Sequence, residues 1–197
     1  MTEIAYPQTL SPLSRAEILE KMHHRLDDER FNHCVRVETT ARVLAGRFGV
    51  DIDRAGLAGL LHDYAKQISV KDYQNLIQTQ GLDPELLNYG RGIWHGLVGV
   101  WFIQRELGVS DPEVLQAIVR HTTGDPAMTA LDQIIFVADF IEPARDLPGE
   151  IAAREAAEHD LLEATLIELT NTLTYLIDNR KVVYPKTLAT YNALIKR

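Results

Sequence analysis

The chain has 197 residues, of which 46% are hydrophobic and 24% are charged. This composition suffices for one globular domain with a hydrophobic core and is not that of a disordered protein. The net charge of −8 disfavours nucleic acid as a partner, because nucleic-acid-binding proteins present a positive surface. A small anionic substrate is still compatible with this charge, since a few converging cations and metal ions can hold a phosphate.

Cysteine usage and the N-terminal segment favour a reducing compartment. Cys34 is the single cysteine, so a disulfide within the chain is excluded. Residues 1–13 have neither the basic start nor the apolar run of a signal peptide. No stretch approaches about 18 consecutive apolar residues, as a membrane-spanning helix requires. We therefore expect a cytoplasmic protein that binds neither membrane nor nucleic acid.

Apolar residues at helical spacing dominate the first half of the chain. The predicted helices, in order, are one that follows a capping box at residues 14–17, one that carries His33 and stops near Gly49, one from Asp51 or Asp53 to Lys66, one from Ser69 to Gly81, and a short one that starts at Asp83.

The second half continues in the same way, and no long alternating run predicts a strand. The predicted helices are one over 94–107 with a stop at Gly108, one capped by Asp111 that runs to His121, one over 131–141, and two or three beyond Gly149. The sequence thus predicts an all-α fold. Residues 14–150 form its core, and residues 151–197 form C-terminal helices that pack on the same domain.

Ligand-type residues occur on several of these helices. His62 and Asp63 are adjacent and follow the small residues Ala58 and Gly59, which permit close helix packing. A neutral imidazole binds metal through a ring nitrogen, and a carboxylate bridges two metals. Further ligand-type residues lie on four other predicted helices, at His33, His95, His121 and Asp139. Helical bundles build metal sites from ligands that converge from facing helices in this way.

A single histidine on an apolar helix face is usually a core residue, and an isolated His-Asp pair is weak evidence. Five separate helices that each offer such a residue inward are harder to explain by packing. Burying so many ionisable groups without compensation costs several kcal/mol each. Metal coordination is therefore the favoured interpretation.

The order His, His-Asp, His, His, Asp resembles the YqeK family of HD-domain phosphohydrolases. The local sequence strings that carry the resemblance lie at 30–37, 60–66, 93–96, 118–124, 138–145 and 184–188. Together they extend the likeness over roughly residues 14–195. The His-Asp pair is unspecific by itself, but the full set of strings is specific.

The resemblance implies an HD-domain helical bundle that hydrolyses dinucleoside polyphosphates symmetrically, splitting diadenosine tetraphosphate into two ADP. It also implies two divalent transition-metal ions, with iron as the usual metal and manganese as an alternative. We assign Asp63 as the bridge between the ions. The other protein ligands are His33, His62 and Asp139 for one ion, and His95 and His121 for the second.

Four residues near these ligands are candidates for substrate contacts. Lys66 follows Asp63 by one helical turn, so its ammonium can meet a phosphate and assist catalysis, unless it is a solvated surface lysine. Arg145 follows the Asp139 helix and can bind a phosphate or form a surface ion pair. Thr122 is either a substrate contact or part of a helix cap. Arg91 lies in a loop that either flanks the pocket or is simply exposed.

Two other functions stay open at this point. One is a different HD-type phosphohydrolase that acts on another small-molecule nucleotide. The other is a nucleotide- or metal-sensing module without turnover, although a sensor has no need of a complete ligand set. The sequence also leaves the oligomeric state open, with a homodimer as one alternative.

Overall fold

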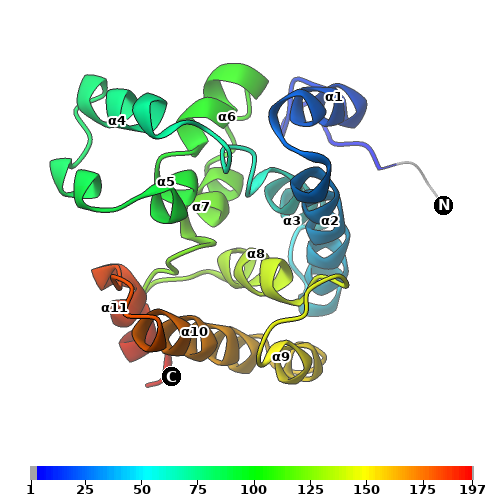
Figure 1. The fold of residues 1–197 in the computed structure, drawn as a ribbon. Coiled ribbons are helices and arrows are strands. Elements are labelled where there is room, and N and C mark those ends of the chain that lie inside the picture. Colours follow the sequence, from blue (N-terminus) through cyan, green and yellow to red (C-terminus); the bar gives the residue numbers. More distant parts are fainter. Residues whose placement is uncertain (1–3, 197) are drawn as a thin grey trace.

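The computed structural model describes residues 4–196, so residues 1–3 of the N-terminal segment considered above lie outside it. Within this range the chain is helical and contains no strand, which confirms the all-α prediction (Figure 1). No helix in it is long and apolar enough to cross a membrane. The elements are α1 (Arg15–Arg25), α2 (Asp28–Phe48), α3 (Ile52–Leu61), α4 (Val70–Thr79), the 3₁₀ helix η1 (Pro84–Asn88), α5 (Arg91–Leu97), α6 (Val100–Leu107), α7 (Pro112–Arg120), α8 (Ala130–Ile141), α9 (Glu150–Ala156), α10 (Leu161–Asp178) and α11 (Pro185–Leu194).

Close packing of α3 on α2 brings the first ligand residues together. A side chain at Gly59 would place its Cβ 3.1 Å from both the Ala41 Cβ and the Val37 carbonyl oxygen. Only glycine therefore permits this approach without a shift of the backbone. All residues of α3 from Ala55 to Leu61 are buried, so the helix is fixed on its partner. As a result, His62 at its end faces His33 on α2.

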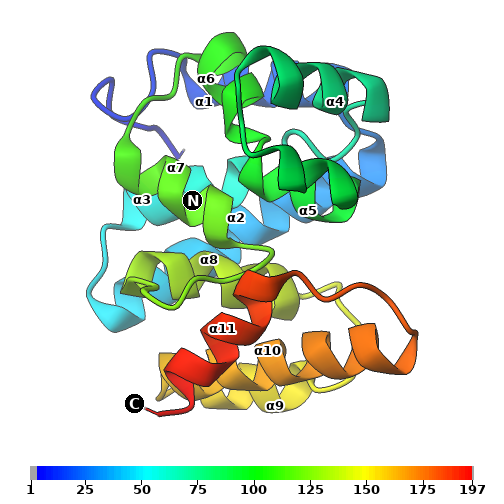
Figure 2. The same ribbon diagram turned by 90° about the vertical axis from the view of Figure 1, so that its left-hand side faces the viewer.

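Helix α8 is the central layer of the molecule. Figure 2 shows it between the upper helices and the C-terminal helices α9 to α11. On the C-terminal side, Phe136 of α8 packs in a second hydrophobic cluster with residues of α10 and α11, including Leu169 and Leu194. Most of α8 is buried, because it is covered on both sides. Asp139 near its end is thereby held between the core and the C-terminal layer.

The prediction that the third helix runs to Lys66 is wrong. Helix α3 ends at Leu61, and tight turns follow, with Lys66 N–H donating to the Asp63 carbonyl at 2.9 Å. The His62 ring nitrogen Nδ1 donates to the Gly59 carbonyl at 2.7 Å. This side chain therefore competes for the acceptor that the next helical hydrogen bond would use.

The prediction of one helix over 94–107 is also wrong. The structure has α5 and α6 instead, with a break at Val98 and Gly99. Gly99 donates its N–H to the Trp94 carbonyl at 3.0 Å. A Cβ at Gly99 would lie 1.9 Å from the His95 carbonyl oxygen and 2.8 Å from the Ala65 Cβ. The chain therefore turns at a point where only glycine fits.

Candidate metal centre

The structure brings the six predicted ligand residues into one cluster. Five of them are at most 3% exposed, and Asp139 is partly buried. They come from the second turn of α2, the end of α3 and the turn after it, α5, the end of α7, and α8. In chain order they are His33, His62, Asp63, His95, His121 and Asp139. Their convergence is a finding of the structure, whereas metal coordination by each one is still a prediction.

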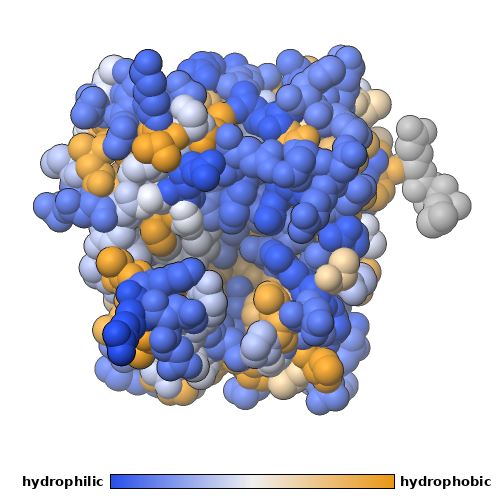
Figure 3. Space-filling model, viewed as in Figure 1, coloured by the Kyte–Doolittle hydropathy of each residue, from blue (hydrophilic) through white to orange (hydrophobic). Residues whose placement is uncertain are grey.

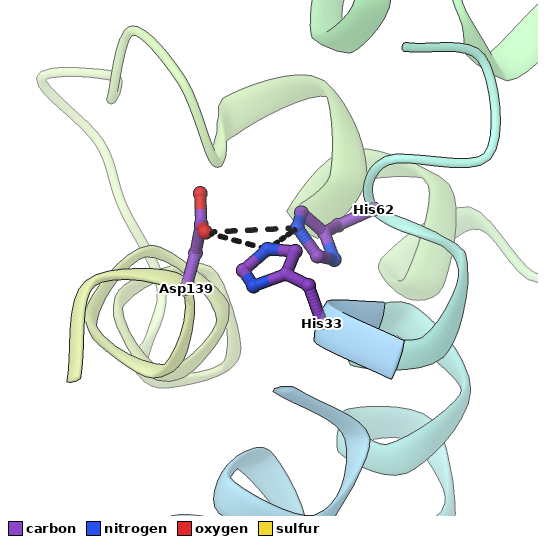
Figure 4. A group of neighbouring side chains, drawn as sticks. All are labelled: His33, His62 and Asp139. Carbon is purple, nitrogen blue, oxygen red and sulfur yellow. Dashed lines mark hydrogen bonds and ion pairs between the residues drawn. The ribbon is translucent and has the colours of Figure 1, made fainter. Parts of the chain in front are cut away.

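The first group within this cluster consists of His33, His62 and Asp139. Figure 4 shows their side chains pointing toward one another from α2, α3 and α8. The Nε2 atom of His33 lies 3.2 Å from Nε2 of His62 and 3.0 Å from Oδ1 of Asp139. His62 Nε2 lies 3.8 Å from the same carboxylate oxygen. Two nitrogen ligands and one oxygen ligand thus surround a single point, which one metal ion can occupy.

Asp63 lies between this group and a second pair of histidines. Its Oδ2 faces His62, with 3.5 Å between Oδ2 and His62 Nε2. Its Oδ1 faces the other way, 3.1 Å from His95 Nε2 and 3.7 Å from His121 Nε2. The two Nε2 atoms of His95 and His121 are 3.0 Å apart. One carboxylate therefore presents one oxygen to each of two histidine groups.

The outer ring nitrogens of the four histidines are all held by hydrogen-bond acceptors. Nδ1 lies 2.7 Å from the Gly59 carbonyl in His62, 2.9 Å from the Arg91 carbonyl in His95, and 2.6 Å from the Ile118 carbonyl in His121. In His33 the acceptor is a carboxylate oxygen of Glu142, at 3.1 Å. Carbonyl and carboxylate oxygens only accept, so each Nδ1 carries a proton. The Nε2 lone pairs of the neutral rings then point into the cluster.

Electrostatics keep the cluster in the form that a metal requires. Burial lowers the pKa of His62 to about 3 and that of His95 to about 4, so both rings are neutral at pH 7. Burial raises the pKa of Asp63, but the adjacent His62 and Lys66 outweigh it and hold this pKa well below its usual value. Burial also raises the pKa of Asp139, but His33, His62 and Arg145 together outweigh burial and hold this pKa well below its usual value.

These observations fit a divalent metal ion. With Nδ1 of each ring protonated, the Nε2 atoms that lie 3.0–3.2 Å apart face each other with lone pairs, and a cation between or beside them relieves that repulsion. Oδ1 of Asp63 is buried and has no hydrogen-bond partner among the described residues. Its ion pair with the Lys66 ammonium at 3.3 Å compensates only part of the cost of burying this charge, and coordination would supply the missing partner. The donor set of imidazole and carboxylate also suits divalent transition metals.

Three basic side chains reach the same cluster. Lys66 places Nζ 2.9 Å from His95 Nε2 and 3.3 Å from Asp63 Oδ1. Arg30 donates to Asp63 Oδ2 at 2.8 Å. Arg145 pairs with Asp139 and also donates from Nε to the Asp139 backbone carbonyl at 2.9 Å. Lys66 and Arg145 both line the adjacent cavity, so they are within reach of an anion there.

The other two predicted substrate residues differ in position. Thr122 has its hydroxyl oxygen 3.0 Å from Nε2 of both His95 and His121, and it lines the cavity. The side chain of Arg91 is exposed, and the cavity wall contains the neighbouring Gly92. Arg91 instead contacts the site through its backbone carbonyl, which accepts from Nδ1 of His95 and orients that ring.

A cavity of about 630 Å³ opens beside the cluster. Its wall combines His95, His121 and Asp139 with residues of the C-terminal layer such as Asn171 and Tyr175. Figure 3 shows this side of the molecule hollowed between the upper helices and the C-terminal layer. The volume lies within the range of about 300–1,000 Å³ that is typical of small-molecule sites. The cluster thus borders a space of suitable size for a nucleotide.

Sequence reasoning missed two carboxylates that shape the site. Glu142 accepts hydrogen bonds from His33 and from Arg36 Nε, the latter at 2.6 Å, and it is buried. Glu168 on α10 lines the cavity and is also buried. Glu142 lies within the string at 138–145 that carries the resemblance, but the sequence indicated only that a helix ends there. Glu168 lies in a leucine-rich helix and has no local sequence signal.

Comparison with known proteins places this cluster in a family. The HD domain model matches residues 30–144, which contain all six ligand residues. A Bacillus subtilis protein named bis(5′-nucleosyl)-tetraphosphatase, symmetrical, is 39% identical over 183 residues, covering 93% of this chain and 98% of that protein. A Staphylococcus aureus protein of the same name is 37% identical over 182 residues, covering 91% and 93%.

A solved structure gives the same result for the fold. It is a crystal structure from Clostridium acetobutylicum, described as a predicted HD superfamily hydrolase involved in NAD metabolism. It superimposes with a TM-score of 0.89 at 35% sequence identity, and the match covers 94% of this chain and 98% of that one. The match therefore includes the C-terminal helices that lie beyond residue 144.

Proposed function

The chain belongs to the HD domain family and, within it, to the symmetrical bis(5′-nucleosyl)-tetraphosphatases, and on this premise we propose how it acts. It hydrolyses diadenosine tetraphosphate and related dinucleoside polyphosphates symmetrically, giving two ADP. Two divalent metal ions assist the reaction, with iron as the resident metal and manganese as a substitute. Imidazole and carboxylate ligands suit both metals.

One observation carries this proposal: the Asp63 carboxylate presents Oδ2 to one histidine group and Oδ1 to the other. Asp63 would hold both ions, and each group of neutral rings would complete the coordination of one of them. The protein ligands are those assigned above: His33, His62 and Asp139 on one side, and His95 and His121 on the other. When bound, the ions would neutralise phosphoryl charge and activate water for in-line attack.

The chain's own cations would hold and orient the tetraphosphate. Lys66 and Arg145 line the cavity and carry positive charge next to the ligand carboxylates. With metal bound, their charges are free to pair with phosphate oxygens instead, Arg145 through its planar fork. The Thr122 hydroxyl at the junction of His95 and His121 offers a further hydrogen bond. We propose that Arg91 contributes through the position of His95 rather than by direct contact.

The position at which the phosphate chain is bound explains why cleavage is symmetrical. ADP is a stable phosphate anion, so its departure needs little help from a proton donor. The residues that bind the middle of the tetraphosphate therefore decide which P–O bond breaks. The two cationic side chains lie on opposite sides of the cluster, Lys66 beside His95 and Arg145 beside Asp139. This arrangement suits binding of the tetraphosphate at its middle.

Product analysis tests this function. Protein loaded with iron or manganese should convert diadenosine tetraphosphate to ADP alone, as resolved by ion-exchange chromatography. Equal amounts of ATP and AMP would contradict symmetrical cleavage. Turnover of another nucleotide in preference would favour a different HD phosphohydrolase, and binding without turnover would favour a sensing module. Light scattering on the same sample determines whether the protein is the homodimer that the sequence left open.

A further inference from the structure

A second cavity adjoins the one beside the metal centre. It measures about 450 Å³, and its wall shares Gly92, Thr122, Thr172 and Tyr175 with the wall of the first. The two cavities therefore adjoin along these four residues, and we treat them as two lobes of one groove. We call the part beside the ligand cluster the metal lobe, and the second part the aromatic lobe. The proposed ligands and cations account for the metal lobe but leave the aromatic lobe without a role.

The wall of the aromatic lobe combines three tyrosines and three aliphatic side chains with neutral polar residues and one lysine. The rings of Tyr89 and Tyr184 meet edge to face, with 4.9 Å between their centroids and 83° between their planes. Tyr175 is 53% exposed, and the Lys181 ammonium lies 4.5 Å from its ring centroid. Tyr89 precedes α5, whereas Tyr184 precedes α11, so the lobe lies between the HD core and the C-terminal layer. Val182 at its edge is 71% exposed.

Charge separates the two lobes. The described residues that line the aromatic lobe include Lys181 but no aspartate or glutamate. The metal lobe instead contains Lys66 and Arg145 together with three carboxylates, those of Asp139, Glu168 and Asp178. The phosphate chain belongs in the metal lobe because the proposed metal ions would lie there with Lys66 and Arg145, and together they would outweigh these carboxylates. A flat, uncharged ring system fits the aromatic lobe, because every nucleobase has a π face that stacks on aromatic side chains.

We propose that the aromatic lobe binds one of the two nucleosides of the substrate, with its base against Tyr89 and Tyr184. The other nucleoside extends from the ligand cluster along the metal lobe, toward Leu147 and Asn171. This inference rests on the proposed function, since only a substrate with a nucleoside at each end fills both lobes. Thr122 belongs to both walls, so the phosphate chain passes it between the two nucleosides.

The sequence string at 184–188 gains a role from this arrangement. Tyr184 is the N-cap residue of α11, where its side chain makes no capping hydrogen bond, and Pro185 occupies the first turn. Thr187, buried one turn later, also lines the aromatic lobe. The start of α11 therefore holds the Tyr184 ring at the groove rather than serving the ligand cluster.

Binding of two cleavage-resistant ligands tests the proposal. Methylene-bridged diadenosine tetraphosphate carries two nucleosides, and methylene-bridged adenosine 5′-tetraphosphate carries one. Both are titrated calorimetrically into manganese-loaded protein. Tyr184→Ala and Tyr89→Ala should weaken the dinucleotide about 5- to 140-fold, the usual cost of losing one stacking contact. The mononucleotide, which has the metal lobe available, should change less than twofold. Tyr184→Phe keeps the ring and should bind both ligands like the wild type.

Two further variants separate stacking from stability. Tyr191→Ala removes a ring from the same helix, one that packs on the second hydrophobic cluster, and should leave both affinities unchanged. Val182→Asp adds a negative charge at an exposed position of the lobe, so it keeps the proposal testable if the tyrosine variants fail to fold. It should weaken the dinucleotide selectively.

The outcomes distinguish this site from the proposed reaction. No loss for either ligand in Tyr184→Ala and Val182→Asp would overturn the aromatic lobe as a nucleoside site, whereas equal loss would show that the mononucleotide also places its base there. A wild-type protein that binds the dinucleotide no more tightly than the mononucleotide would also overturn it. Because neither ligand is cleaved, selective loss would support the site even if product analysis failed to find two ADP.

Discussion

Replacing Glu142 by glutamine removes a negative charge behind His33 while keeping the size of the side chain. In the native protein Glu142 Oε1 lies 3.1 Å from His33 Nδ1, and Arg36 Nε and the Ala144 N–H donate to Oε2 at 2.6 and 2.8 Å. Although burial raises the pKa of Glu142, these hydrogen bonds lower it to about 2. The carboxylate is therefore fully charged at pH 7 and fixes the tautomer and orientation of the His33 ring.

The expected loss follows from that contact. Removing the outer partner of a metal-binding histidine typically costs about 10- to 100-fold in metal affinity, or about 1.4–2.8 kcal/mol. We expect the upper half of this range, because Glu142→Gln also leaves the Arg36 guanidinium without its counter-charge beside His33. The ion held by His33, His62 and Asp139 should weaken, and the ion at His95 and His121 should be less affected.

Manganese titration in competition with a chromophoric chelator measures this effect. Glu106→Gln is the matched control, because Glu106 also pairs with an arginine, Arg25, and accepts from the Tyr64 hydroxyl at 2.8 Å, but lines neither lobe of the groove. It should leave both metal affinities unchanged. Thermal unfolding of the metal-free variants shows whether the fold survives. Wild-type affinity for both ions in Glu142→Gln would refute the role of Glu142.

Three other predictions concern the ligand cluster. Lys66→Ala should keep its metal content but lose about 10- to 100-fold in kcat/KM, because a charge-assisted phosphate contact is worth about 1.5–3 kcal/mol. An unchanged kcat/KM would contradict a phosphate contact by Lys66. Asp63→Ala should lose metal, measured by mass spectrometry, together with activity, since one carboxylate serves both ions. Chelator-treated protein should lose unfolding free energy as pH falls from about 6.5 to 4 in denaturant titrations. Native His62 and His95 have pKa values of about 3 and 4, so unfolding takes up protons in this window, and a flat profile would contradict buried neutral rings.

The ligand cluster was predictable because its residues combine two local signals. Each ligand residue lies on or directly beside a helix with a recognisable apolar pattern, and the adjacent pair His62-Asp63 is itself conspicuous. Gly59 was noted as a point of close packing, and the structure places it against Ala41 and Val37. Spacing along the chain was therefore enough to propose which residues meet, although it gave no distances.

The features that sequence reasoning missed depend on contacts between distant segments. The end of α3 depends on a hydrogen bond from the His62 ring to Gly59, which helix propensity does not include. The break before α6 depends on the approach of Gly99 to Ala65. Pairing of Tyr89 with Tyr184 joins residues 95 positions apart, so no local pattern predicts that the two rings form one wall.

Anomalous X-ray diffraction from a manganese-loaded crystal tests the central claim most directly, because it locates the ions independently of activity. We predict two peaks, one beside Oδ2 of Asp63 among His33, His62 and Asp139, and one beside Oδ1 among His95 and His121. A single peak that Asp63 does not contact, or two peaks that do not share Asp63, would contradict a carboxylate-bridged pair of metal ions.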